Sequence, residues 1–252
     1  MRWYVVGTVL LCACSSTAAN AANLAISMGI RETGGSGPAF SNAGSTGGIE
    51  FVNLDGQSLT ADGTWQLFSF TPSTDALTAF AGATANGVLD TDWASLEHIR
   101  IRNVDGIISP IRLWIDDVSN TDAAGTATEG FEGFAVGNEV MFQEPGFSGS
   151  TSGNINVATD SAAVSGSMVH SGQQSYEVNF QFVDNTNTRW VRLTSFGATN
   201  LPNVAVHVRE VGAAAPTVSF YAKAVVIPEP SSLMLIAGSL MMLVSLPRRR
   251  AA

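Results

Sequence analysis

The chain has 252 residues and a net charge of −9, which is enough length for one large β-sandwich or two small domains. Residues 22–227 carry 8 basic and 20 acidic side chains, a net charge of −12, which repels a phosphate backbone and argues against a nucleic-acid partner. Both cysteines, Cys12 and Cys14, precede this region, so it can form neither an internal disulfide nor a cysteine-ligated metal site.

The N-terminus has the pattern of a secretion signal. Arg2 is followed by an apolar run, Trp3–Ala13, and then by small residues. Ala19 and Ala21 fit the small-residue pattern at which signal peptides are cleaved. We therefore expect residues 1–21 to form an N-terminal signal helix that directs export and is then removed.

A second processing route stays open. The segment Leu11-Cys12-Ala13-Cys14 resembles a loose lipoprotein box, although Cys12 is an unusual residue at its position. In the first route both cysteines are lost with the signal peptide, whereas in the second route Cys14 is lipidated.

Short alternating runs between turn residues predict that the body of the chain is made of strands. Every second residue is apolar, as in half-buried antiparallel strands, in the four runs His98–Arg102, Ile111–Asp116, Ser175–Val183 and Val204–Val211. Asn103-Val104-Asp105-Gly106 predicts a hairpin turn that joins the first two runs. We expect an all-β fold, an antiparallel β-sandwich of about ten strands.

A run of small and polar residues, Ser119–Thr128, is predicted to be a linker. It divides the body into a first half, residues 22–118, and a second half, residues 129–227.

The C-terminus has three successive parts. The triplet Pro228-Glu229-Pro230 is followed by an apolar segment, Ser231–Leu246, and then by the basic cluster Arg248, Arg249 and Arg250. As a helix the apolar segment would be about 24 Å long, short of the hydrocarbon core of about 30 Å, so we expect a transient transmembrane helix. The arginines should stay cytoplasmic, which places the body on the far side of the inner membrane.

This arrangement resembles the PEP-CTERM sorting signal, over residues 228–252. The resemblance implies recognition by an exosortase, a membrane cysteine protease-transpeptidase of Gram-negative bacteria, which would cut near the triplet and release or transfer the body. It also implies a location at the cell surface or in the extracellular matrix, where such proteins are linked to exopolysaccharide and biofilm.

The body weakly resembles a jelly roll of the kind found in carbohydrate-binding modules. The likeness rests on the segments Thr64–Phe70, Leu113–Val118, Gly130–Phe134 and Gly172–Tyr176. The first half looks like the closing half of such a fold, and the second half looks like an opening half. Two readings follow: one sandwich in permuted order, or two small incomplete sandwiches.

No catalytic motif is recognisable. The three histidines, His98, His170 and His207, show no metal-ligand spacing, and no Gly-x-Ser-x-Gly elbow is present. We therefore expect a protein that is not an enzyme, although a glycosidase with two paired carboxylates depends on geometry that a sequence does not give.

A basic and aromatic surface is the best binding candidate. If the two runs before and after residues 103–106 pair, Trp114 lies near Arg100, Arg102 and Arg112. Arginines on adjacent strands repel each other, and an acidic polysaccharide would relieve that repulsion through ion pairs, with Trp114 stacked on a sugar ring. In the alternative reading, Trp114 is buried against the second half and the arginines pair with internal acids.

Three carboxylates are candidate ligands for a structural Ca²⁺, which prefers hard oxygen ligands. They are Asp116 and Asp117, at the end of a predicted strand, and Glu132 in the second half; ordinary solvated carboxylates are the alternative. No other cofactor is expected. The sequence as a whole predicts an exported, non-catalytic matrix β-sandwich associated with exopolysaccharide, with a structural or adhesive protein lacking a specific ligand, or a glycan-degrading enzyme, as alternatives.

Overall fold

A computed structural model of the protein describes residues 22–212 and 214–228. Almost all regular structure in these residues is β, and a single short 3₁₀ helix is present. The elements are β1 (Asn23–Arg31), β2 (Ile49–Thr60), β3 (Gln66–Phe70), β4 (Leu77–Ala81), β5 (Trp93–Asn103), β6 (Ile111–Asp122), β7 (Gly125–Glu129), η1 (Ser152–Asn154), β8 (Ser161–Ser165), β9 (Ser175–Phe180), β10 (Trp190–Thr194), β11 (Ala205–His207) and β12 (Thr217–Val226).

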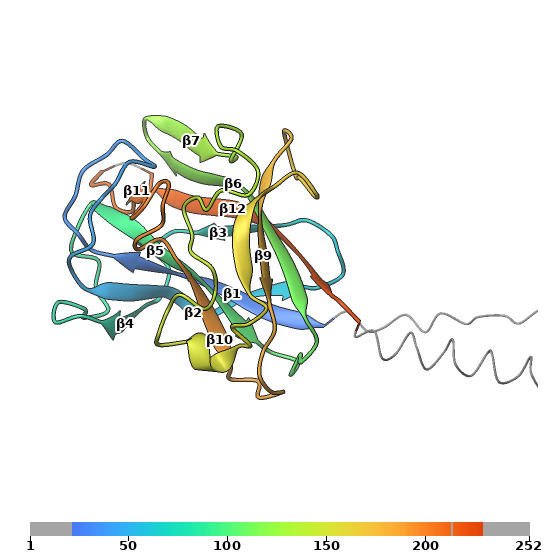
Figure 1. Ribbon diagram of the computed structural model, residues 1–252. Helices are drawn as coiled ribbons and strands as arrows, with labels where there is room; N and C mark the ends of the chain where they lie inside the picture. Colours follow the sequence, from blue (N-terminus) through green and yellow to red (C-terminus); the bar gives the residue numbers. More distant parts are fainter. Residues whose placement is uncertain (1–21, 213, 229–252) are drawn as a thin grey trace, which may run out of the picture.

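The strands form two antiparallel six-stranded sheets, which gives the β-sandwich (Figure 1). The first sheet has the order β10-β5-β1-β2-β4, with β11 paired to β5. The second sheet has the order β3-β12-β6-β9-β8, with β7 paired to β6. The all-β prediction is therefore confirmed.

Alternation along the strands builds the core between the sheets. In β1, the side chains of Leu24, Ile26, Met28 and Ile30 are fully buried and belong to one continuous apolar cluster that includes residues of both sheets. Intervening residues, including Gly29 and Arg31, lie on the opposite face, because successive side chains of a strand point to opposite sides. We call this the outer face of the first sheet.

The predicted hairpin between residues 98–102 and 111–116 is wrong. The first run lies in β5 of the first sheet and the second run lies in β6 of the second sheet, so residues 104–110 cross between the sheets. The Asn103 side chain fixes this crossing, since it donates to the carbonyl of Ile107 and accepts from its amide. Two strands with an apolar side chain at every second residue can pair edge to edge in one sheet, or they can face each other across a core. The alternation alone does not distinguish these arrangements.

The segment predicted to be a linker, Ser119–Thr128, is instead part of a β-hairpin. β6 continues to Asp122, and β7 pairs back on it from Asp122↔Gly125 to Val118↔Glu129. Small and polar residues suit this exposed hairpin as well as they suit a linker. Each sheet contains strands from both sides of this segment, so the two halves share one core.

Both ends of the described chain lie at one end of the sandwich (Figure 1). Ala22 accepts a hydrogen bond from the amide of Ala61, and the next residue, Asp62, bridges to Val225 near the end of β12. The amide of Ile227 still donates to Pro110, whereas Pro228 is exposed. One residue, Ile227, therefore separates the last strand from the predicted sorting triplet.

Several predicted features lie outside the described residues. They are the signal peptide with Ala19 and Ala21, the cysteine Cys14, the remainder of the triplet (Glu229 and Pro230), the apolar segment Ser231–Leu246 and the cluster Arg248, Arg249 and Arg250. Within residues 22–212 and 214–228, no helix is both long enough and apolar enough to cross a bilayer.

A β-bulge in β5 shapes the outer face of the first sheet. Gly29 pairs with His98 and Ile30 pairs with Leu96, which leaves Glu97 as the extra residue. The extra residue breaks the alternation, so Glu97 and His98 both lie on the outer face, while Leu96 and Ile99 point into the core.

We predict that Gly29→Ala lowers the free energy of unfolding by about 1–3 kcal/mol, as overpacking of a filled site does. A Cβ atom at Gly29 would overlap the His98 ring, which lies fully buried on the neighbouring strand. Urea denaturation of the purified protein measures the change. Gly133→Ala is the matched control, because a Cβ there meets nothing within 4 Å; equal stability of the two variants would contradict the close packing.

Candidate functional site

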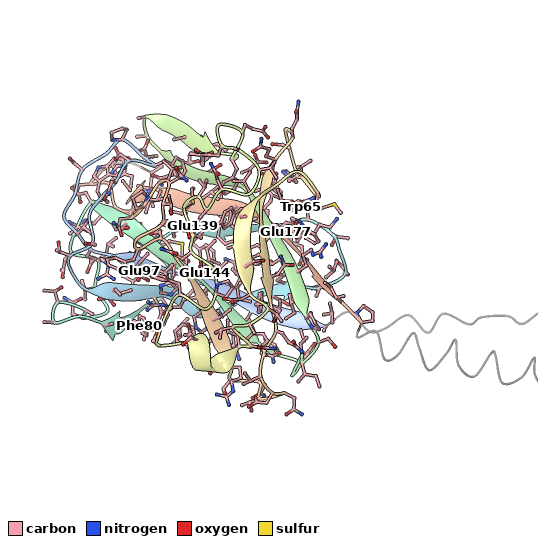
Figure 2. All side chains as sticks on the ribbon, viewed as in Figure 1. Trp65, Phe80, Glu97, Glu139, Glu144 and Glu177 are labelled. Carbon is pink, nitrogen blue, oxygen red and sulfur yellow. The ribbon has the colours of Figure 1, made fainter. Side chains whose placement is uncertain are left out.

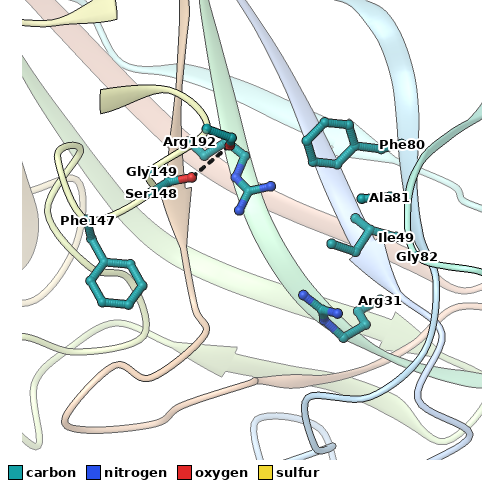
Figure 3. A pocket seen from close by; sticks show the side chains of 10 residues that line it. Arg31, Ile49, Phe80, Ala81, Gly82, Phe147, Ser148, Gly149 and Arg192 are labelled. Atoms are coloured by element: carbon teal, nitrogen blue, oxygen red, sulfur yellow. Dashed lines mark hydrogen bonds between the residues drawn. The ribbon is translucent and has the colours of Figure 1, made fainter. Parts of the chain in front are cut away.

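A groove of about 450 Å³ lies on the outer face of the first sheet (Figure 3). Arg31 and Arg192 line it, together with Phe80 of β4 and the loop that carries Phe147 and Ser148. Figure 3 shows both guanidinium groups directed into the space between Phe80 and this loop. The groove therefore combines two cations with aromatic rings and a hydroxyl-bearing loop.

The strand order explains why the arginines meet. Arg31 is the last residue of β1 and Arg192 lies in the middle of β10, and β5 runs between these two strands. The carboxylate of Glu97 in β5 bridges them, because its Oε1 atom lies 3.3 Å from Nη2 of Arg31 and 3.6 Å from Nη2 of Arg192. Two guanidinium groups thus share one carboxylate oxygen.

Arg192 is only 14% exposed, yet its hydrogen-bonding capacity is almost unused. Within residues 22–212 and 214–228 the side chain of Arg192 makes no hydrogen bond. The buried Nε atoms of Arg192 and Arg31 both lack an acceptor. Arg31 donates to the carbonyl of Gly47 and to Glu97. These two Nε atoms are enclosed by the protein and out of reach of a ligand. The Nη groups, by contrast, point into the groove (Figure 3) and can donate to an acceptor from outside the chain.

The charge states of Glu97 and His98, which are both buried, leave the groove with a net positive charge. Burial opposes ionisation of Glu97, but its electrostatic contact and hydrogen bond with His98, followed by the charges of Arg192 and Arg31, outweigh it, so the pKa of Glu97 lies below its ordinary value. Complete burial lowers the pKa of His98 despite its contact with Glu97. At neutral pH one carboxylate therefore faces two guanidinium groups, and His98 is neutral and donates from Nδ1 to Glu97.

An aromatic cluster supports the arginines, and Phe80 is the member of this cluster that lines the groove. Phe51 lies 4.4 Å from Phe80 and 5.7 Å from Trp190, measured between ring centroids. The guanidinium of Arg192 lies 5.2 Å from the Phe80 centroid, and that of Arg100 lies 4.9 Å from the Trp190 centroid. Such cation–π contacts hold each guanidinium in place without using its N–H donors in hydrogen bonds.

The four residues predicted to bind glycan do not meet on one surface. Arg100 and Arg102 lie in the first sheet, where they donate to the carbonyls of Leu54 and Asp55. Trp114 and Arg112 lie in β6 of the second sheet.

The side chain of Trp114 is buried rather than available to a sugar. Trp114 is 4% exposed, and its Nε1 atom donates to Ser167 and Glu177, both at 3.1 Å. Arg112 pairs with the same Glu177 at 3.3 Å. The alternative reading, in which Trp114 is buried and this arginine pairs with an internal acid, therefore describes this part of the second sheet. Figure 2 labels Glu97 and Phe80 near the first sheet, and Glu177 near β9 of the second.

The expected calcium ligands hold a loop instead of facing one another across an open site. Asp116 accepts from the amides of His170 and Ser171, at 2.8 and 3.2 Å. Asp117 accepts from the side chains of the same two residues, both at 2.7 Å. Glu132 accepts from the amides of Gln173 and Gln174, at 2.7 and 3.0 Å. In the part of the chain that the structure describes, no three His, Cys, Asp or Glu side chains are grouped to hold a metal ion.

Reasoning from sequence missed most of this groove. It identified Arg100, which contacts the aromatic cluster, but not Arg31, Arg192 or Phe80. It did not identify Phe147 and Ser148 of the loop either. One usable signal was present, because Arg31 and Arg192 each occupy a position that alternates with apolar residues of a strand, and this predicts that they point away from the core.

No protein-family model, no curated protein and no solved structure matches this chain. The fold and the groove therefore define the class of protein: an antiparallel two-sheet β-sandwich with a positively charged, aromatic-lined groove on one outer face.

We predict that His98→Gln flattens the pH dependence of stability between about pH 6.5 and 5. Because the pKa of His98 is lowered by burial, the unfolded chain takes up a proton that the folded chain does not. The free energy of unfolding then falls as the pH drops below 6.5, by up to about 1.4 kcal/mol per pH unit. Glutamine binds no proton and still donates to Glu97.

Urea denaturation at several pH values measures this slope. The lowered pKa of Glu97 makes a separate contribution, which is complete above its ordinary value of 4.5 and is lost only at lower pH. Burial raises the pKa values of Glu32 and Asp116, but these groups are present in both proteins, so the difference between the wild-type and variant slopes reports His98. Equal slopes for the wild type and the variant would show that the buried histidine is not neutral.

Proposed function

We propose that this protein is an exported, non-catalytic, jelly-roll-like β-sandwich of the surface or extracellular matrix of a Gram-negative bacterium. In this proposal an exosortase sorts it through its C-terminal segment, and the groove on the first sheet binds exopolysaccharide. The protein passes transiently through the inner membrane and acts without a cofactor.

The single observation that carries glycan binding is a buried guanidinium with unused donors beside aromatic rings. Arg192 is held by Phe80 and by a 3.6 Å ion pair with Glu97, while the Nη groups of its guanidinium point into the groove (Figure 3). The rest of the body has a large excess of negative charge, so this positive site is a local exception. An acidic sugar would supply the missing acceptors, and its apolar face would contact the aromatic rings.

The position of the chain ends fits a sorted surface protein. Pro228 is exposed directly after β12 and is therefore accessible to a protease. The same end of the sandwich contains the start of β1, whereas Arg31 lies at the other end of that strand, about 26 Å away at 3.3 Å per residue. A body still attached to the membrane through its tail would thus carry Arg31 away from the point of attachment.

Replacement of Pro228, Glu229 and Pro230 by alanine is expected to block sorting. In cells that possess an exosortase, the variant should accumulate uncut in the inner membrane, whereas the wild-type body appears at the cell surface or in the medium. Fractionation and immunoblotting of both forms measure this. Wild-type protein that persists uncut in the inner membrane of such cells would contradict the sorting proposal.

Arg192→Gln is expected to weaken binding of acidic exopolysaccharide by about 10- to 100-fold, because a charge-assisted hydrogen bond contributes about 1.5–3 kcal/mol. Glycan arrays followed by titration calorimetry of the full chain in detergent measure the affinity. Arg112→Gln is the control, since Arg112 lies on the second sheet, where it pairs with Glu177. Wild-type protein that binds no glycan would favour a structural or adhesive role, and release of shortened glycans would instead show an enzyme.

A further inference from the structure

We infer that the groove recognises the carboxylate of a hexuronate residue within an acidic polysaccharide, with Arg31 and Arg192 as its ligands and Glu97 as a built-in counter-ion. This inference rests on the proposed glycan binding and specifies its chemistry. It predicts which acidic groups bind and which do not.

The balance of charge favours a ligand with one negative charge. Two guanidinium groups line the groove, the buried carboxylate of Glu97 lies behind them, and the neighbouring His98 is neutral and fully buried. The remaining single positive charge is matched by one carboxylate. A phosphate monoester carries about −1.5 to −2, so it would leave unbalanced negative charge beside Glu97.

The geometry of the donors favours a planar acceptor. Each guanidinium is a flat fork that matches the two oxygens of a carboxylate. The Nη2 atoms of Arg31 and Arg192 both lie within 4 Å of the same Glu97 oxygen, which brings the two guanidinium groups side by side. In this inference a second carboxylate accepts from the Nη groups that point into the groove (Figure 3). A carboxylate is also a more basic acceptor than a sulfate ester, which strengthens its hydrogen bonds to the arginines.

The walls of the groove suit a sugar ring rather than a free ion. Phe80 lies on one side, and Phe147, which is 42% exposed, lies on the loop opposite. Ser148 and Ser150 of the same loop hydrogen-bond to each other at 3.0 Å and supply hydroxyl groups that can exchange partners with those of a sugar (Figure 3). A volume of about 450 Å³ falls within the range of about 300–1,000 Å³ that is typical of small-molecule sites.

Defined oligosaccharides test this inference on the full chain in detergent. The probes are trigalacturonate, its methyl ester, a sulfated neutral trisaccharide, free galacturonate and poly-L-glutamate. We expect trigalacturonate to bind at least tenfold more tightly than its methyl ester, the sulfated sugar and poly-L-glutamate. Free galacturonate should bind more weakly than the trisaccharide, as expected for a residue recognised inside a polymer.

Variants assign the preference to the groove. Arg192→Gln should bring the affinity ratio of acid to methyl ester close to one, and Arg192→Lys, which keeps the charge but loses the fork, should give an intermediate ratio. Arg112→Gln, on the second sheet, should keep the wild-type ratio. The thermal midpoint of each variant shows that it is folded, and the Lys variant provides the test if the Gln variant does not fold.

The outcomes separate this inference from the proposed function. Equal binding of acid and methyl ester, or tighter binding of the sulfated sugar, would overturn carboxylate recognition and leave glycan binding in place. Poly-L-glutamate that binds as tightly as trigalacturonate would overturn recognition of a sugar. Tighter binding of free galacturonate would overturn recognition within a polymer. An absence of binding to every glycan would overturn the proposed function and this inference with it.

Discussion

Glu97 and His98 are consecutive residues of β5, yet both side chains lie on the outer face of the first sheet, because a β-bulge interrupts the alternation at this point. The bulge places a carboxylate between β1 and β10, where it can bridge Arg31 and Arg192. Without that carboxylate, two buried guanidinium groups would repel each other at low dielectric. The groove therefore depends on a local irregularity of one strand.

The surroundings of the bulge are adapted to it. Gly29 leaves room for the His98 ring across the sheet, and Phe51 and Phe80 lie against the same ring with centroids at 5.4 and 6.0 Å. A neutral histidine donates to Glu97 without adding a third positive charge. The hydrogen bond from His98 thus stabilises the ionised carboxylate of Glu97 in a site where burial alone would favour its protonated form.

The two sheets differ in how far the polar and charged side chains on them find hydrogen-bond partners within the protein. On the second sheet, Arg112, Trp114 and Glu177 satisfy one another, and the acids Asp116 and Asp117 accept hydrogen bonds from a covering loop. On the first sheet, Arg192 keeps donors without acceptors within the described residues. This difference in hydrogen-bond satisfaction, more than the number of charges, distinguishes a candidate binding surface from a structural one.

The sequence by itself determined the β class and the places of four strands, because an apolar residue at every second position fixes which face of a strand is buried. It also determined the order of the C-terminal parts and the absence of cysteine from residues 22–227, which are properties of the chain alone. Strand pairing was decided only by tertiary structure. The runs at 98–102 and 111–116 have the same alternation whether they pair edge to edge or face each other across a core. The groove likewise required the fold, since Arg31, Phe80, Phe147 and Arg192 are far apart in the chain and meet only because β5 lies between β1 and β10.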